Sequence, residues 1–151
     1  MSLVDDINAK LKQAMLERDQ FRAGVYRDLK SAILYEEVAK NKRDEGLDDA
    51  EIEAVVMREV KKRNDAIEAY EGAGDKERAN KEAAERDILQ QFLPEQISRE
   101  ELEKIILEKI TETGAESIKD MGRVIGAVKQ AVGNSASGAE ISEIVKNNLK
   151  G

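Results

Sequence analysis

Apolar residues recur every three or four positions along most of this chain, in seven stretches separated by glycine, serine, aspartate or proline. This spacing places side chains on one face of an α-helix, so each stretch predicts an amphipathic helix. No stretch alternates apolar and polar residues as a half-buried β-strand would. The pattern therefore predicts an all-α fold of about seven helices.

Four of these helices are predicted before residue 94. They begin at Ser2, Asp19, Asp48 and Asp75, whose short polar side chains are suited to capping helix N-termini. Residues 40–46 predict a solvated loop, and the glycines at 72 and 74 predict the end of the third helix. The residues predicted to face the core are Val4, Ile7, Leu11, Ala14, Met15, Phe21, Val25, Leu29, Ala32, Ile33, Ile52, Val56, Val60, Ile67, Tyr70, Ala79, Ala83, Ile88, Leu89 and Phe92.

Pro94 is the only proline and marks a change in the pattern. Proline cannot continue a helix, and Ser98 followed by Glu101 has the spacing of a capping box that starts a new one. The apolar neighbours Phe92 and Ile97 indicate a packed hinge rather than a flexible linker. We therefore predict two helical modules, 1–93 and 94–151, joined at a proline-containing hinge.

Three helices are predicted after Pro94. They begin at Ser98, Ser117 and Ser137, the first stops at Gly114, and residues 133–136 form a turn. The residues predicted to face this second core are Leu102, Ile105, Ile106, Ile110, Ile118, Met121, Val124, Ile125, Val128, Val132, Ile141, Ile144, Val145 and Leu149.

Composition limits the chemistry. The chain has no cysteine and no histidine, which removes thiolate catalysis, Cys/His zinc sites and the usual base for a serine nucleophile. It also has no phosphate-binding glycine motif and no metal-ligand motif, so neither a cofactor nor a metal is expected. The lack of a secretory pattern or a long apolar run favours a cytoplasmic protein without membrane contact. A net charge of −7 opposes nucleic-acid binding except at a local basic face.

One such face lies on the helix predicted after Ser117. Opposite its apolar stripe are Lys119, Gly122, Arg123, Gly126 and Lys129. Each glycine inside a helix costs about 1 kcal/mol relative to alanine, so two glycines four residues apart indicate that something approaches the backbone. The approaching group is either a phosphate or RNA backbone held by the flanking cations, or a neighbouring helix packed on a seat of small residues.

A second basic cluster is predicted on the third helix, at Arg58, Lys61, Lys62 and Arg63. Acidic residues such as Glu59 and Asp65 are interleaved with it. The cluster is either a nucleic-acid contact or a solvated helix surface with ion pairs four residues apart, and the interleaving favours the surface.

Several stretches resemble the YqeY family, also called GatB/YqeY, and the resemblance covers essentially the whole chain. These stretches are Arg27–Ile33, Lys61–Ile67, Ala73–Asp75, Phe92–Ser98, Asp120–Gly126 and Ala136–Lys146. The resemblance implies two helical parts, the second similar to the three-helix tail of the B subunit of glutamine-dependent aspartyl/glutamyl-tRNA amidotransferase, which contacts tRNA. It also implies a link to carbon–nitrogen ligase activity with glutamine as amido donor.

Carried onto this chain, the resemblance implies an RNA-binding face at Lys119, Gly122, Arg123, Gly126 and Lys129, with Asn134 in the following turn. That turn departs from the family pattern. Where relatives commonly have Lys-Gly-Arg-Ala-Asp-Gly, this chain has Gly-Asn-Ser-Ala-Ser-Gly at residues 133–138, so both basic residues are missing. We expect Asn134 to adopt the left-handed conformation and Ser137 to cap the last helix in place of aspartate.

Three functions follow as hypotheses. The first is a tRNA-associated accessory protein, with tRNA and an amidotransferase as partners, that is not catalytic alone. The second is a helical module that binds another protein and no RNA. The third is a free-standing enzyme, which the residue inventory makes the weakest of the three because no catalytic constellation is present.

Overall fold

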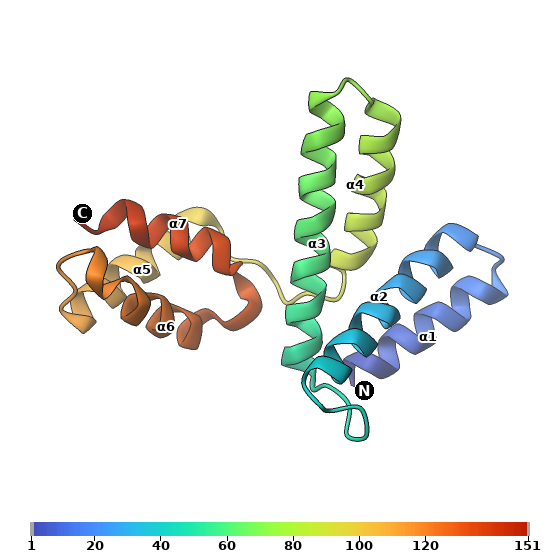
Figure 1. Cartoon of the computed structure of the whole chain (residues 1–151), viewed down its shortest axis with the longest axis horizontal. Helices are drawn as coiled ribbons and strands as arrows, with labels where there is room; N and C mark the ends of the chain where they lie inside the picture. Colours follow the sequence, from blue (N-terminus) through green and yellow to red (C-terminus); the bar gives the residue numbers. More distant parts are fainter. Residues whose placement is uncertain (1, 151) are drawn as a thin grey trace. The chain divides into compact units, whose positions relative to one another are not determined.

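The computed structural model describes residues 2–150, and over that range the chain is all α, with seven α-helices and no strand (Figure 1). The predicted fold class is therefore confirmed. The helices are α1 (Leu3–Leu16), α2 (Gln20–Ala39), α3 (Asp49–Gly72), α4 (Lys76–Gln90), α5 (Arg99–Thr113), α6 (Met121–Val132) and α7 (Gly138–Asn148), with 3₁₀ turns η1 (Ile118–Asp120) and η2 (Gly133–Ser135).

Local capping explains where these helices begin. The hydroxyl oxygens of Ser2, Ser98 and Ser137 each accept the backbone N–H three residues later, at 3.3, 3.1 and 3.1 Å. Asp48 and Glu51 form a complete capping box, in which each side chain accepts the other's N–H. Because a capping side chain satisfies an N–H that the helix leaves unpaired, six of the seven predicted starts are confirmed. The start predicted at Ser117 was wrong for the α-helix, because η1 follows Ser117 and α6 begins only at Met121.

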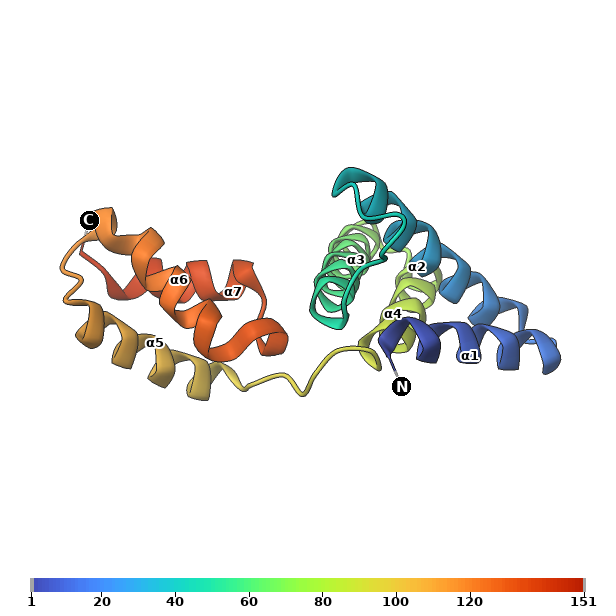
Figure 2. The same cartoon turned by 90° about the horizontal axis from the view of Figure 1, so that it is seen from below.

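The residue contacts divide the chain into two compact units, one ending at Leu93 and one beginning at Pro94. The first unit contains two antiparallel hairpins, α1 with α2 and α3 with α4 (Figures 1 and 2). Its core is aliphatic apart from Tyr26 and Phe92, whose rings meet edge to face at 6.0 Å. The Tyr26 hydroxyl accepts hydrogen bonds from Arg22 and Gln91.

Several residues predicted to face this core are exposed or only half-buried. Val4, Met15 and Phe21 expose 36%, 53% and 39% of their surface, while Ile67 and Tyr70 are half-buried. Each helix of the α1–α2 hairpin has neighbours on only part of its circumference. An apolar stripe wider than that contact therefore leaves its edge residues in solvent.

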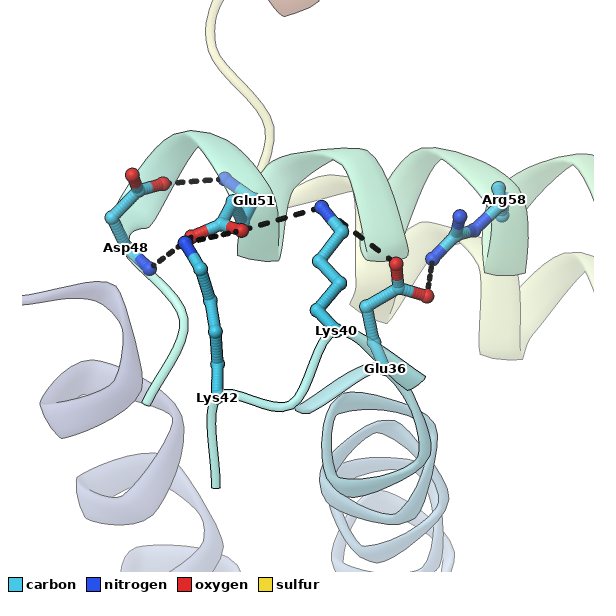
Figure 3. A network of polar contacts seen from close by, with 6 residues as sticks. All are labelled: Glu36, Lys40, Lys42, Asp48, Glu51 and Arg58. Carbon is cyan, nitrogen blue, oxygen red and sulfur yellow. Dashed lines mark hydrogen bonds and ion pairs between the residues drawn. The ribbon is translucent and has the colours of Figure 1, made fainter. Parts of the chain in front are cut away.

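The connection between α2 and α3 is mostly exposed at residues 40–46, as expected of a solvated loop, and a polar network ties it down (Figure 3). Lys42 Nζ lies 3.0 and 3.1 Å from the two Glu51 carboxylate oxygens, and Lys40 Nζ lies 3.3 Å from one of them. Glu36 accepts from Arg58 at 2.6 Å and also pairs with Lys40. These charges join the end of α2, the loop and the first turns of α3.

The second unit packs α5, α6 and α7 around its own core (Figure 1). Two backbone hydrogen bonds join segments of this unit that are far apart in the sequence. Ile97 N–H donates to the Ser135 carbonyl, and Ile118 N–H donates to the Lys150 carbonyl, both at 2.9 Å. Ile118 was predicted to face the core but is 40% exposed, because it lies in η1, a 3₁₀ turn before α6, and not in the α-helix itself.

Residues 91–98 around Pro94 are not helical, which confirms the predicted break between α4 and α5. The packed hinge stays a prediction. No helix among residues 2–150 is long and apolar enough to span a bilayer.

Candidate nucleic-acid interface

Helix α6 has two chemically different faces. Val124 and Val128 are fully buried, and Met121 and Ile125 pack against the same core. The residues predicted for RNA binding, Lys119, Gly122, Arg123, Gly126 and Lys129, are all exposed and recur at spacings of three or four. This spacing aligns them along one side of the segment from η1 through α6.

The two glycines of α6 face open space. A Cβ atom built on Gly122 or Gly126 would have no heavy atom within 4 Å, apart from the backbone of its own helix and its chain neighbours. Neither α5 nor α7 therefore packs on this pair. The alternative of a packing seat within the chain is wrong, because the neighbouring helices contact α6 on its apolar side.

Arg123 is held by an aspartate that also starts α6. Its guanidinium donates to Asp120 Oδ1 at 3.0 Å, while Asp120 Oδ2 accepts the N–H groups of Glu116 and Ser117 at 3.0 and 3.4 Å. Those two backbone hydrogen bonds are the main reason that the pKa of Asp120 is lowered, and Arg123 adds to the effect. This pair was not predicted from the sequence, although the three-residue spacing of Asp120 and Arg123 could have indicated it.

Lys129 reaches from the last turn of α6 toward the first residue of α7. Its Nζ and Cε lie 3.6 and 3.7 Å from the position that a Cβ on Gly138 would occupy. The absent side chain at Gly138 thus leaves room for the lysine. The ammonium group of Lys129 therefore lies near the start of α7.

Asn134 is placed differently from the prediction. Gly133, and not Asn134, has a positive φ, of 55°. Glycine lacks the Cβ atom that makes this region costly for other residues, so it takes the turn's strained position. Asn134 lies half-buried in η2, and its carbonyl accepts a hydrogen bond from Gln96 at 3.0 Å. It lies in the turn beyond the α6 face and is not part of that face.

The second basic cluster is neutralised by carboxylates. Arg58 pairs with Glu36, Lys61 with Asp65, and both Lys62 and Arg63 with Glu59. This confirms the ion-paired interpretation for the cluster. Solvation was the wrong expectation for one member, since the Arg63 side chain is only 14% exposed.

Arg63 lies between α3 and α4, with Nε 3.9 Å from a carboxylate oxygen of Glu82 and 3.9 Å from one of Glu85. Burial, and then the nearby Glu82, raise the pKa of Glu85. Within residues 2–150 no group of three acidic side chains is arranged to hold a metal ion.

Comparison with protein families matches a model described as "Yqey-like protein" over residues 4–149. Comparison with curated proteins gives no match. The family match spans nearly all of both units and agrees with the resemblance carried by the sequence motifs. The chain therefore belongs to the YqeY-like family.

Proposed function

We propose that this protein is a tRNA-associated accessory protein whose second unit binds the RNA backbone along the exposed face of α6. The observation that carries the proposal is the open glycine pair. Gly122 and Gly126 weaken their helix by about 1 kcal/mol each relative to alanine, yet no side chain of the described chain uses the space they leave. A ligand from outside the chain would use it.

The charges around the pair suit a phosphate backbone. Lys119 and Lys129 lie at the two ends of the face, and Arg123 lies beside the glycines. Arginine can donate two parallel hydrogen bonds to one phosphate, and the contact with Asp120 orients the guanidinium in advance. Contacts of this kind position an RNA without reading its sequence.

The role is accessory because catalytic groups are missing from the face. Its polar side chains are those of Lys119, Arg123 and Lys129, which suit phosphate binding, and no nucleophile with an adjacent base lies among them. The resemblance to the amidotransferase tail supports the same division of labour, in which this part holds tRNA and other domains carry out carbon–nitrogen bond formation.

The test is fluorescence anisotropy of labelled bulk tRNA with the full-length protein at low salt. We expect micromolar binding to the wild type and at least about a tenfold loss for Lys119→Glu/Arg123→Glu, because two phosphate contacts become repulsive. A matched control, Lys104→Glu/Lys146→Glu, makes the same charge change on exposed positions of α5 and α7. Circular dichroism checks that each variant folds.

Equal loss in both variants would mean that only net charge matters, and absence of wild-type binding at low salt would reject the RNA-binding function. The alternative is then a helical protein–protein interaction module without RNA binding. The observation that favours this alternative is the set of large apolar side chains exposed on α1 and α2.

A further inference from the structure

An open groove lies on the α1–α2 hairpin of the first unit. Its volume is about 530 Å³, and its lining residues are Asn8, Leu11, Lys12, Met15, Leu16 and Lys30. Met15 and Leu16 are 53% and 71% exposed, which is unusual for adjacent large apolar residues in a helix. The RNA-binding proposal makes no use of this surface.

The groove continues as an apolar strip toward the open end of the hairpin. Val4 lies one turn before Asn8 on α1, and Leu34 lies one turn after Lys30 on α2. Both are partly exposed, at 36% and 42%. Because α1 and α2 run antiparallel (Figure 2), both positions lie toward the same end of the hairpin, away from the α1–α2 connection.

Two lysines flank these apolar side chains. Lys12 from α1 and Lys30 from α2 both line the groove, and neither forms an ion pair with any residue in the described range. No aspartate or glutamate is among the lining residues, so these two lysines are the charged groups of the groove. In a protein of net charge −7, they create a local positive rim around an apolar floor.

We propose that this groove is a docking site for an amphipathic helix of a partner protein, with large aliphatic residues on one side and flanking carboxylates. The partner's aliphatic side chains would pack on Leu11, Met15 and Leu16, and its carboxylates would meet Lys12 and Lys30. Helix α1 has 14 residues and is about 21 Å long, which matches a partner helix of three to four turns.

Other occupants fit less well. Two copies meeting groove to groove about a two-fold axis would bring the lysines of one copy against those of the other. A flat lipid surface does not fill a groove between two helices. RNA would leave the apolar floor exposed, because phosphates do not pack on aliphatic side chains.

The test uses two synthetic helical peptides of about 14 residues with identical leucine stripes, one flanked by glutamates and one by lysines. Amide chemical shifts of the ¹⁵N-labelled full-length protein report binding. We expect the glutamate peptide to shift residues 8–16 and 27–34 saturably, and to bind at least about tenfold more tightly than the lysine peptide.

Two variants locate the site. Lys12→Glu/Lys30→Glu is expected to reverse the preference between the peptides, and Met15→Glu is expected to weaken both. All three positions are at the surface, so the fold should survive, and Lys104→Glu/Lys146→Glu in the second unit is the charge-matched control.

Four outcomes would overturn the proposal. They are the absence of shifts up to millimolar peptide, equal affinity for both peptides, self-association that Met15→Glu abolishes, and binding to anionic vesicles in place of the peptide. The last two would assign the groove to a second copy or to a lipid surface. None of these outcomes depends on whether α6 binds tRNA.

Discussion

At the scale of single residues, Glu51 in the first unit has a strongly lowered pKa. Its carboxylate accepts the Asp48 N–H and contacts both Lys42 and Lys40 (Figure 3). The backbone hydrogen bond, followed by that from Lys42, lowers the pKa of Glu51 from 4.5 to about 2. A carboxylate whose folded-state pKa lies below its unfolded value stabilises the fold above pH 4.5, and this contribution is lost as the pH falls toward 2.

We therefore expect Glu51→Gln to lower the free energy of unfolding at pH 7. The difference from wild type should shrink steadily between pH 4.5 and pH 2, because wild-type Glu51 becomes protonated there. Urea denaturation followed by circular dichroism at several pH values measures the difference. Glu68→Gln, an exposed position on the same helix, is the control and should change little. A difference independent of pH would contradict the role of ionised Glu51.

At the scale of one element, substitutions at the two glycines of α6 should change the stability of the fold and the affinity for RNA in opposite directions. Replacing Gly122 and Gly126 by alanine adds two Cβ atoms that meet no neighbouring side chain. Alanine restricts the unfolded chain and favours the helix, so we expect a stability gain of about 0.4–1 kcal/mol for each substitution. If α6 binds RNA as proposed, the same double variant should bind tRNA about tenfold more weakly, because the methyl groups keep the backbone away from phosphate.

Thermal unfolding and tRNA anisotropy of Gly122→Ala/Gly126→Ala measure both effects. Gly24→Ala is the matched control: this glycine also lies inside a helix with no heavy atom near a built Cβ, but in the first unit. It should gain similar stability and leave tRNA affinity unchanged. If the α6 variant is more stable and still binds tRNA with full affinity, the glycines have no role in RNA binding.

At the scale of the whole molecule, the proposed RNA contact is a small basic face on an acidic protein. Residues 95–151 carry 8 basic and 10 acidic residues, so even this unit has a net charge of −2. Lys119, Arg123 and Lys129 are the three cations available for phosphates on the face. Three released counterions predict that the logarithm of tRNA affinity falls with the logarithm of salt concentration with a slope between about −2 and −3.

Titrations of tRNA at four or more salt concentrations measure this slope. The Lys129→Glu variant should reduce its magnitude by about 1. A wild-type slope near zero would indicate an apolar interface, and a slope steeper than about −5 would require many more cations than this face contains.

The helices could be read from the sequence because helix formation depends on local spacing and capping. Ser98 and Ser137 were identified from sequence, and both accept the expected N–H. The interruption at Pro94 was predictable for the same reason, since a proline acts on its own turn. The turn before α7 was predicted less well, because either Gly133 or Asn134 could take the positive φ.

Contacts between elements could not be read in this way. Periodicity placed Met15 toward the core, but the neighbours of α1 cover only part of its surface, and the structure leaves this residue in a groove. The sequence likewise could not say whether a helix packs on Gly122 and Gly126, because either environment suits the same spacing.

The sequence by itself determined the all-α class, the helix starts other than that of α6, and the cations of the candidate RNA face, because these depend on residues within a turn or two of each other. The tertiary structure alone decided which apolar residues are buried, that Arg63 is enclosed by carboxylates, and that the α6 glycines face open space. Those properties depend on which segments meet across the fold, and spacing along one helix does not encode the position of its neighbours.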